Sequence, residues 1–151
     1  MLRYTYTLMT GKFVARRWFL ERAAQVLCKI PGVGLLTATA AVATMGEAAS
    51  FKSGREFAAW AGLVPRQRGT GGQVRQLGLS KRGDVYLRTL LMHGARSIVI
   101  RHRNVPWIAA LLARRPYNVA VAAVANKLAR TIWAVLAKGK PYDRAAFSAV
   151  A

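Results

Sequence analysis

The sequence predicts an all-α fold, a compact helical domain with a helix-hairpin-helix-like turn and one irregular, basic, glycine-rich loop. Apolar residues recur at helical spacing over most of the chain. No stretch carries a strong strand signal, and proline and glycine divide the chain into segments of helical length. At 151 residues the chain fits one domain that is long enough to bury a core.

The apolar periodicity predicts six helices. They cover Phe13–Lys29, Leu35–Glu47, Ser50–Gly62, Val85–Arg101, Trp107–Ala113 and Asn118–Lys138. In the fourth of these, Leu87, Leu91, Ala95 and Ile98 form the stripe expected to be buried. By organisation, residues 1–20 are expected to be a poorly defined N-terminal segment, residues 21–144 the domain, and residues 145–151 a loosely held tail.

Two helix starts carry capping residues. Ser53 precedes Glu56 by three positions, which is the spacing of a capping box. Asp84 stands directly before the fourth helix, where its carboxylate can cap the helix or pair with Lys81 or Arg82. Either role of Asp84 is structural.

The first two predicted helices are separated by Ile30-Pro31-Gly32-Val33-Gly34. A hydrophobic residue followed by Pro-Gly-Val-Gly resembles a helix-hairpin-helix turn, in which Gly32 and Gly34 let the backbone approach a DNA phosphate closely and N–H groups at the start of the second helix hold it. A plain turn between two helices would also select glycine. Both interpretations remain open from the sequence.

Charge points to a polyanionic partner. The chain has 24 Lys and Arg against 5 Asp and Glu, a formal net charge of +19, and a pI of about 11.7. Between Arg66 and Arg103 there are nine bases and one acid. Such one-signed charge costs stability through self-repulsion but suits binding to nucleic acid. An anionic membrane is the alternative, yet arginine interleaved with glycine, rather than a lysine-rich amphipathic anchor, favours nucleic acid.

The central loop is the strongest candidate for this contact. Arg66, Arg68 and Arg75 can each donate two hydrogen bonds to a phosphate, and the glycines between them let the backbone lie against a charged ligand. A mobile, solvated hairpin is the alternative interpretation. The full set of predicted nucleic-acid-binding residues is Gly32, Gly34, Arg66, Arg68, Thr70, Gly71, Gly72, Arg75, Lys81, Arg82, Arg88 and Arg96.

The single cysteine, Cys28, excludes an internal disulfide and a multi-cysteine zinc site, and its apolar neighbours predict a buried, inert thiol. No metal site or cofactor is expected in this chain, because five scattered acids do not form a metal cluster. Residues 1–10 lack the features of a signal peptide, and no apolar run predicts a membrane span. A cytoplasmic protein without membrane attachment is expected.

Four segments, in order and at matching spacing, resemble the C-terminal domain of the insertion sequence 110/116/902 transposase family. They are Ile-Pro-Gly-Val-Gly at 30–34, Phe-Lys-Ser-Gly-Arg-Glu-Phe-Ala-Ala-Trp-Ala-Gly-Leu-Val-Pro-Arg-Gln at 51–67, Thr-Gly-Gly at 70–72, and Leu-Gly-Leu-Ser-Lys-Arg-Gly-Asp-Val-Tyr-Leu-Arg at 77–88. The resemblance covers residues of about 22 to 144. It implies a DNA transposase or recombinase whose N-terminal domain, folded like a Holliday-junction resolvase, holds divalent metal with four acidic residues. It also implies a serine nucleophile in the C-terminal domain and a structured guide RNA.

The chain departs from the family pattern in two respects. The acidic metal-binding domain is not found in it, so the chain is expected to be a fragment, and residues 1–20 do not match the family's usual lead-in. The family's Ser-Ser or Ser-Thr before Gly-Gly is here Gly69-Thr70, so glycine stands at the position of the expected nucleophile. Thr70 and Ser80 are weaker candidates, since the β-methyl of threonine shields its hydroxyl and Ser80 precedes a helix.

These observations predict a DNA-binding and strand-transfer domain of an insertion-sequence transposase that does not catalyse transposition alone, so no catalytic residue is assigned. The alternatives are a non-catalytic helix-hairpin-helix module that binds nucleic acid, and a degenerate gene product without activity. The apolar fraction of 54% suggests that another copy of the chain or the missing N-terminal domain covers part of the surface. The expected partners are therefore DNA, a structured guide RNA and one of these protein surfaces.

Overall fold

The computed structural model describes residues 21–139 and 141–143. The predictions for residues 1–20 and for the tail at 145–151 lie outside the described residues, as does the first part of the helix predicted over Phe13–Lys29. Residues 21–27 are helical. The elements that follow are α2 (Leu35–Met45), the 3-10 turn η1 (Ala48–Ser50), α3 (Gly54–Trp60), β1 (Pro65–Thr70), β2 (Gln73–Leu79), α4 (Val85–Arg101), α5 (Pro106–Arg114) and α6 (Tyr117–Lys138).

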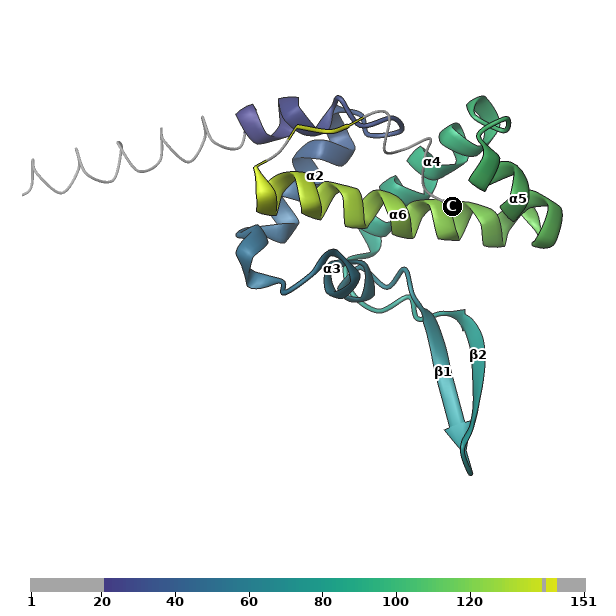
Figure 1. The fold of residues 1–151 in the computed structure, drawn as a ribbon. Coiled ribbons are helices and arrows are strands. Elements are labelled where there is room, and N and C mark those ends of the chain that lie inside the picture. Colours follow the sequence, from purple (N-terminus) through teal and green to yellow (C-terminus); the bar gives the residue numbers. More distant parts are fainter. Residues whose placement is uncertain (1–20, 140, 144–151) are drawn as a thin grey trace, which may run out of the picture.

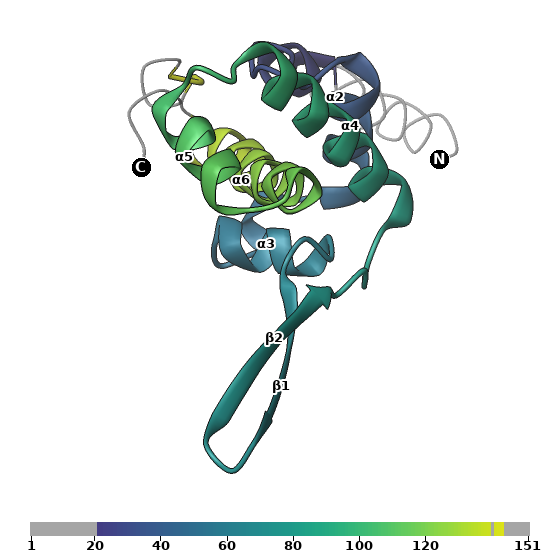
Figure 2. The ribbon, with the colours of Figure 1, turned by 90° about the vertical axis from the view of Figure 1, so that its right-hand side faces the viewer.

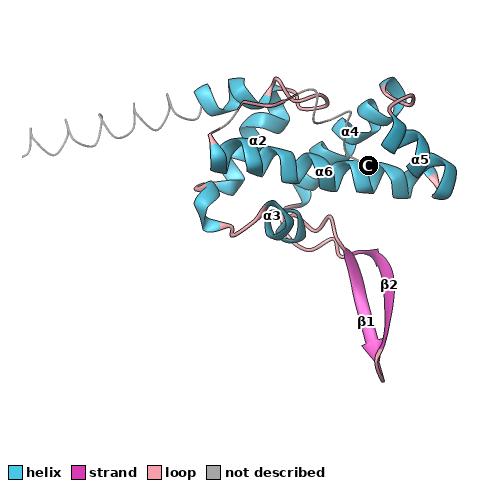
Figure 3. Ribbon diagram, in the orientation of Figure 1, coloured by secondary structure: helices cyan, strands magenta, loops and turns pink. Residues whose placement is uncertain are grey.

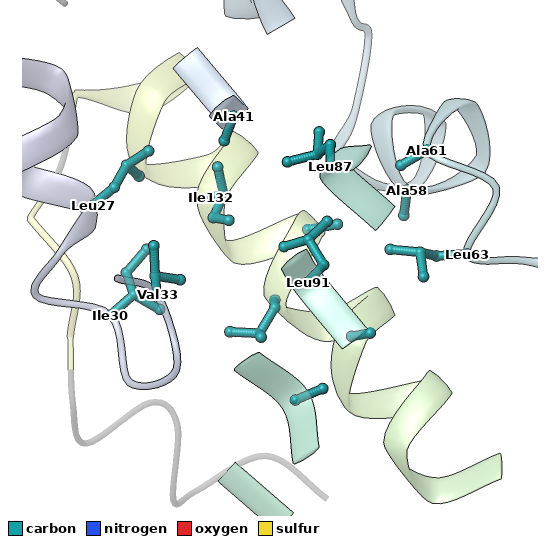
Figure 4. Packing of buried hydrophobic residues seen from close by; sticks show 14 of the residues in the cluster. Leu27, Ile30, Val33, Ala41, Ala58, Ala61, Leu63, Leu87, Leu91 and Ile132 are labelled. Atoms are coloured by element: carbon teal, nitrogen blue, oxygen red, sulfur yellow. The ribbon is translucent and has the colours of Figure 1, made fainter. Parts of the chain in front are cut away.

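Helix α6 lies at the centre of the helical body (Figure 1). It packs against α3, α4, α5 and η1, while α2 packs against α4. Buried side chains from residues 27–63 and from α4 converge on Ile132 and its neighbours on α6 (Figure 4). Of the described helices, only α6 is long and apolar enough to cross a membrane, and its apolar face is the one buried in this core.

The predicted helices are largely confirmed. Helix α4 has the predicted bounds, and Leu87, Leu91, Ala95 and Ile98 are all buried. Ser53 Oγ accepts a hydrogen bond from Glu56 N at 3.2 Å, so Ser53 caps the helix as predicted, while the Glu56 carboxylate reaches back to Lys52 N, one residue before the cap, at 2.7 Å. The segment predicted as one helix over Ser50–Gly62 is instead a 3-10 turn followed by the shorter α3, because Ser53 begins a new helix.

The prediction of an all-α fold with an irregular loop is wrong at one place. Residues 65–79 form a two-stranded antiparallel sheet, β1 with β2, which projects from the helices (Figure 3). Its two-residue turn consists of Gly71 and Gly72, whose φ angles of 60° and 81° are those that tight hairpin turns require. The fold is therefore mostly helical with one small sheet.

The turn after residue 27 contains Gly32, which packs on α4, and Cys28, whose predicted burial is wrong. Gly32 has φ 77°, and a Cβ there would lie 2.7 Å from the carbonyl oxygen of Gly94 on α4, so the turn packs directly on that helix. Cys28, predicted to be buried, is exposed. It lies just past the end of the helical residues, where Leu27 and Ile30 occupy the core positions on either side of it.

Candidate nucleic-acid interface

The β1–β2 hairpin is a free-standing basic element. Residues 65–69 and 71–78 are all exposed, and two views show the hairpin extending away from the helices (Figures 1 and 2). A hairpin alone is marginally stable in water, and no face of this one is buried on a core. Its shape therefore serves to present side chains rather than to build the core.

Arg68 and Arg75 face each other across the two strands. Directly opposite like charges destabilise a strand pair, and neither guanidinium has a hydrogen bond or ion pair within the described part of the chain. Arg66, on β1 as well, is equally exposed. The strand pairing therefore places two like charges opposite each other on an exposed element.

The base of the hairpin is held tightly. A Cβ at Gly62 would collide with the backbone of Arg82, and a Cβ at Gly83 would collide with the carbonyl of Trp60. Both glycines have positive φ angles, 74° and 83°. Two chain segments can therefore pass each other at van der Waals contact only because neither position carries a side chain.

Two polar side chains fasten this base to the helices. Arg88 on α4 donates through Nη1 to the carbonyl of Arg82 at 3.2 Å, with a longer contact of 3.5 Å to the carbonyl of Ala61. Asn126 on α6 donates through Nδ2 to the carbonyl of Leu63 at 3.0 Å. Asp84 accepts a hydrogen bond from Leu87 N at 2.7 Å and caps α4 where the chain leaves the hairpin. These contacts fix the direction in which the hairpin points.

The structure brings only part of the predicted nucleic-acid site together. Arg66, Arg68, Thr70, Gly71, Gly72 and Arg75 lie on the hairpin, and Lys81 and Arg82 are exposed at its base. Arg88 is half-buried, and its guanidinium makes the contacts with the hairpin base just described. Arg96 is exposed further along α4.

The turn at residues 30–34 lies at the opposite end of the helical body from the hairpin (Figures 1 and 2). There Gly32 faces Gly94 rather than solvent, whereas a Cβ at Gly34 would meet nothing within 4 Å. Gly34 is the N-cap residue of α2, and no side chain caps that helix.

The positions considered for a nucleophile differ in access. Gly69 is exposed in β1, and a Cβ there would make ordinary contacts, the nearest at 3.4 Å to the carbonyl oxygen of Gln73, so the strand has room for a serine. Thr70 is the last residue of β1. Ser80 lies at the other end of the hairpin from Gly69. Its Oγ is buried and has no hydrogen-bond partner among the described residues, and this burial shields it from a ligand. Within the described residues, no group of three or more His, Cys, Asp or Glu could hold a metal ion.

Sequence reasoning missed a second basic surface. A groove of about 1070 Å³ runs along α6 between α3, α5 and residues 141–143. The cationic residues that line it are Arg55, Arg114, Lys127, Arg130 and Lys138. Lys127, Arg130 and Lys138 lie on α6, Arg55 lies on α3 and Arg114 on α5, so the surface exists only where these three helices pack together.

The chain is similar in sequence to known transposases. The model of the transposase IS116/IS110/IS902 family matches residues 24–113. A probable family 20 transposase of Pseudomonas aeruginosa is 50% identical over 123 residues, which are 78% of this chain and 36% of that protein. The transposase for insertion sequence element IS1111A of Coxiella burnetii is 46% identical over 118 residues, 75% of this chain and 32% of the relative.

A third relative extends the match over slightly more of the chain. The transposase for insertion sequence element IS1328 of Yersinia enterocolitica is 40% identical over 129 residues, 82% of this chain and 39% of the relative. The chain thus spans about a third of the length of these curated relatives. The family match contains the whole β1–β2 hairpin, the glycines at its base and Arg88. The chain belongs to the IS116/IS110/IS902 transposase family.

Proposed function

We propose that this chain is the C-terminal, nucleic-acid-binding part of a DNA transposase, and that the β1–β2 hairpin is its contact with DNA. The observation that carries the proposal is the opposed pair of Arg68 and Arg75 on a hairpin that has no packing role of its own. Two guanidiniums on one strand pair can clamp a phosphate with parallel hydrogen bonds. Contacts of this kind position a protein on nucleic acid without reading its sequence.

We infer that this chain does not carry out strand transfer alone. Glycine at position 69 has no side chain with which to attack a phosphodiester, and no carboxylate cluster suited to divalent metal is present among the described residues. We infer that any catalysis requires the further domain of a full-length transposase, which would hold the metal. We also infer that such an assembly works in the cytoplasm, on DNA with a structured guide RNA, as an oligomer or with that domain covering part of the apolar surface.

The test is a binding series with labelled duplex DNA and with structured RNA over a range of salt concentrations. An Arg66/Arg68/Arg75→Ala variant is compared with an Arg101/Arg103/Arg115→Ala variant, which removes the same charge from exposed positions elsewhere. Each phosphate contact contributes about 0.9 to the slope of log K against log salt concentration on duplex DNA, so loss of three contacts should lower the slope by about 2.7. The control should keep the wild-type slope.

Equal losses in the two variants would mean that net charge alone attracts the nucleic acid and would refute the role of the hairpin. The two nucleic acids separate a DNA contact from a guide-RNA contact, since the hairpin variant should lose affinity for the one that the hairpin holds.

A second candidate, binding through the turn at residues 30–34, is favoured by the open space at Gly34 and is tested in the same series. Gly34→Ala is the suitable variant, because its φ of −92° accommodates alanine and its Cβ meets no neighbour. Gly32→Ala is unsuitable, since it would collide with α4. A larger loss of affinity in Gly34→Ala than in the hairpin variant would move the site to this turn.

A further inference from the structure

The groove along α6 is built by one close helix contact. Gly54, the first residue of α3, lies so near α6 that a Cβ there would be 3.1 Å from the Cα and carbonyl oxygen of Arg130. This contact sets Arg55 beside Arg130, although the two positions are far apart in the sequence. Trp133 completes the wall, with Nε1 donating to the carbonyl of Ala48 at 3.0 Å.

The exposed cations of the groove come from three helices. Arg55 belongs to α3, Arg114 to α5, and Arg130 and Lys138 to α6. All four are exposed. The side chains of Arg55, Arg130 and Lys138 form no hydrogen bond or ion pair within the described part of the chain, and Arg114 donates through Nε only to the carbonyl of Ala110. The only acid lining the groove is Asp143.

Apolar and aromatic side chains also line the groove. They are Ala110, Leu111, Ala123, Ala134 and Val135, together with Trp107 and Trp133. Lys127 lies across Trp107, with Nζ 4.0 Å from the ring centroid. Burial lowers the pKa of Lys127, and the charge of Arg130 lowers it further. An anion in the groove would relieve this repulsion between the two cations.

We propose that this groove binds a single strand of nucleic acid, with phosphates against Arg55, Arg130 and Lys138 and bases toward the apolar and aromatic residues that line it. Non-specific single-strand sites combine a basic groove with apolar and aromatic surface in this way. From Lys127 to Lys138 the helix rises about 16 Å, at 1.5 Å per residue, so the cations of the groove are spread along its length. In a duplex the base faces are stacked on one another and cannot lie against the apolar residues of the groove.

The proposal stands on the charges of the groove and does not require the hairpin to bind. Its test uses a labelled single-stranded DNA and the same sequence as a duplex. An Arg55/Arg130/Lys138→Ala variant is compared with the Arg66/Arg68/Arg75→Ala hairpin variant and with the Arg101/Arg103/Arg115→Ala control, all three of which remove equal charge. Circular dichroism verifies that each remains folded, as expected for changes at exposed positions.

The groove variant should lose about 2 units of salt slope on the single strand, at about 0.7 per phosphate, and keep its affinity for the duplex within a few fold. Wild-type binding of the single strand by the groove variant would overturn the proposal, and so would equal losses on both DNA forms. Displacement of the strand by poly-glutamate at equal charge concentration would overturn it too, since the site would then be a general anion site. If the hairpin proposal is wrong, the hairpin variant will bind duplex DNA with the affinity and salt dependence of the wild type, whatever the groove variant does.

Discussion

At the scale of single residues, the hairpin depends on positions that carry no side chain. Gly62 and Gly83 cross at its base, each facing a backbone atom of the other segment. Gly71 and Gly72 make the turn at its tip, where added atoms would meet nothing. All four have positive φ angles, so backbone conformation alone does not distinguish them. Steric contact does, and it makes the two ends of the hairpin respond differently to substitution.

Gly83→Ala should therefore destabilise the protein far more than Gly71→Ala. At Gly71 the cost is that of a left-handed conformation for alanine, about 1–2 kcal/mol in the free energy of unfolding. At Gly83 a collision with the carbonyl of Trp60 is added, which forces the backbone at the hairpin base to move. Urea unfolding of the two variants measures the difference. Similar midpoints in both would show that the segments at the base are not held in the contact described.

Predictions for single residues were confirmed where they depended only on neighbouring residues in the sequence. Ser53 and Asp84 cap their helices as expected, since an N-cap depends on residues within one turn. The prediction for Cys28 failed because its exposure depends on where the first helical segment ends and on which neighbours reach the core. Arg88 was expected to contact nucleic acid. In the structure it donates to the carbonyls of Arg82 and Ala61, and the sequence did not indicate these partners because only folding brings them near Arg88.

At the scale of elements, the helices were predicted directly, whereas a hairpin was only the alternative interpretation of the basic loop and its strands were not predicted. Helix α4 shows a clear stripe because one of its faces is buried, so its apolar residues repeat with the helical period. Neither face of the β1–β2 hairpin is buried, and the apolar and polar alternation that identifies a strand is therefore missing. The one local signal was Gly71-Gly72 between two segments of strand length, which is typical of a two-residue hairpin turn. The α6 groove was equally hidden, since it arises from the packing of α3 and α5.

Replacing residues 66–78 by Gly-Gly should leave the helical body folded. Pro65 and Leu79 are paired across the hairpin base, so a short linker can join them. The deleted part carries only exposed side chains where these are described, and its loss should change the free energy of unfolding by less than about 1 kcal/mol. Thermal unfolding followed by circular dichroism measures this. Leu63→Ala, at a fully packed position beside the base, is the contrasting control and should cost about 2–5 kcal/mol.

A deletion variant that loses cooperative unfolding would mean that the hairpin contributes to the core, against its exposure. If the variant folds as expected, it also isolates the α6 groove, because any nucleic-acid binding that remains cannot come from the hairpin.

At the scale of the whole molecule, cationic residues occupy both the hairpin and the α6 groove, while α6 itself holds the helical body together. The formal charge of +19 with only five acids leaves most cations without a carboxylate partner. Net charge so far from zero destabilises the compact state through self-repulsion. Binding of a polyanion relieves this repulsion between cations. The relief makes the free energy of binding more favourable.

The thermal stability of the free protein should therefore rise with salt. Repulsion between exposed charges reaches about 30 Å at 0.01 M ionic strength and about 8 Å at 0.15 M, and each kcal/mol relieved should raise Tm by about 2–4 °C for a chain of this size. Scanning calorimetry over this range measures the trend. Nucleic-acid affinity should fall over the same range, because the counterions released on binding become more concentrated. A Tm that falls with salt would show that attractive charge pairs dominate the free protein, and would remove self-repulsion as a source of binding free energy.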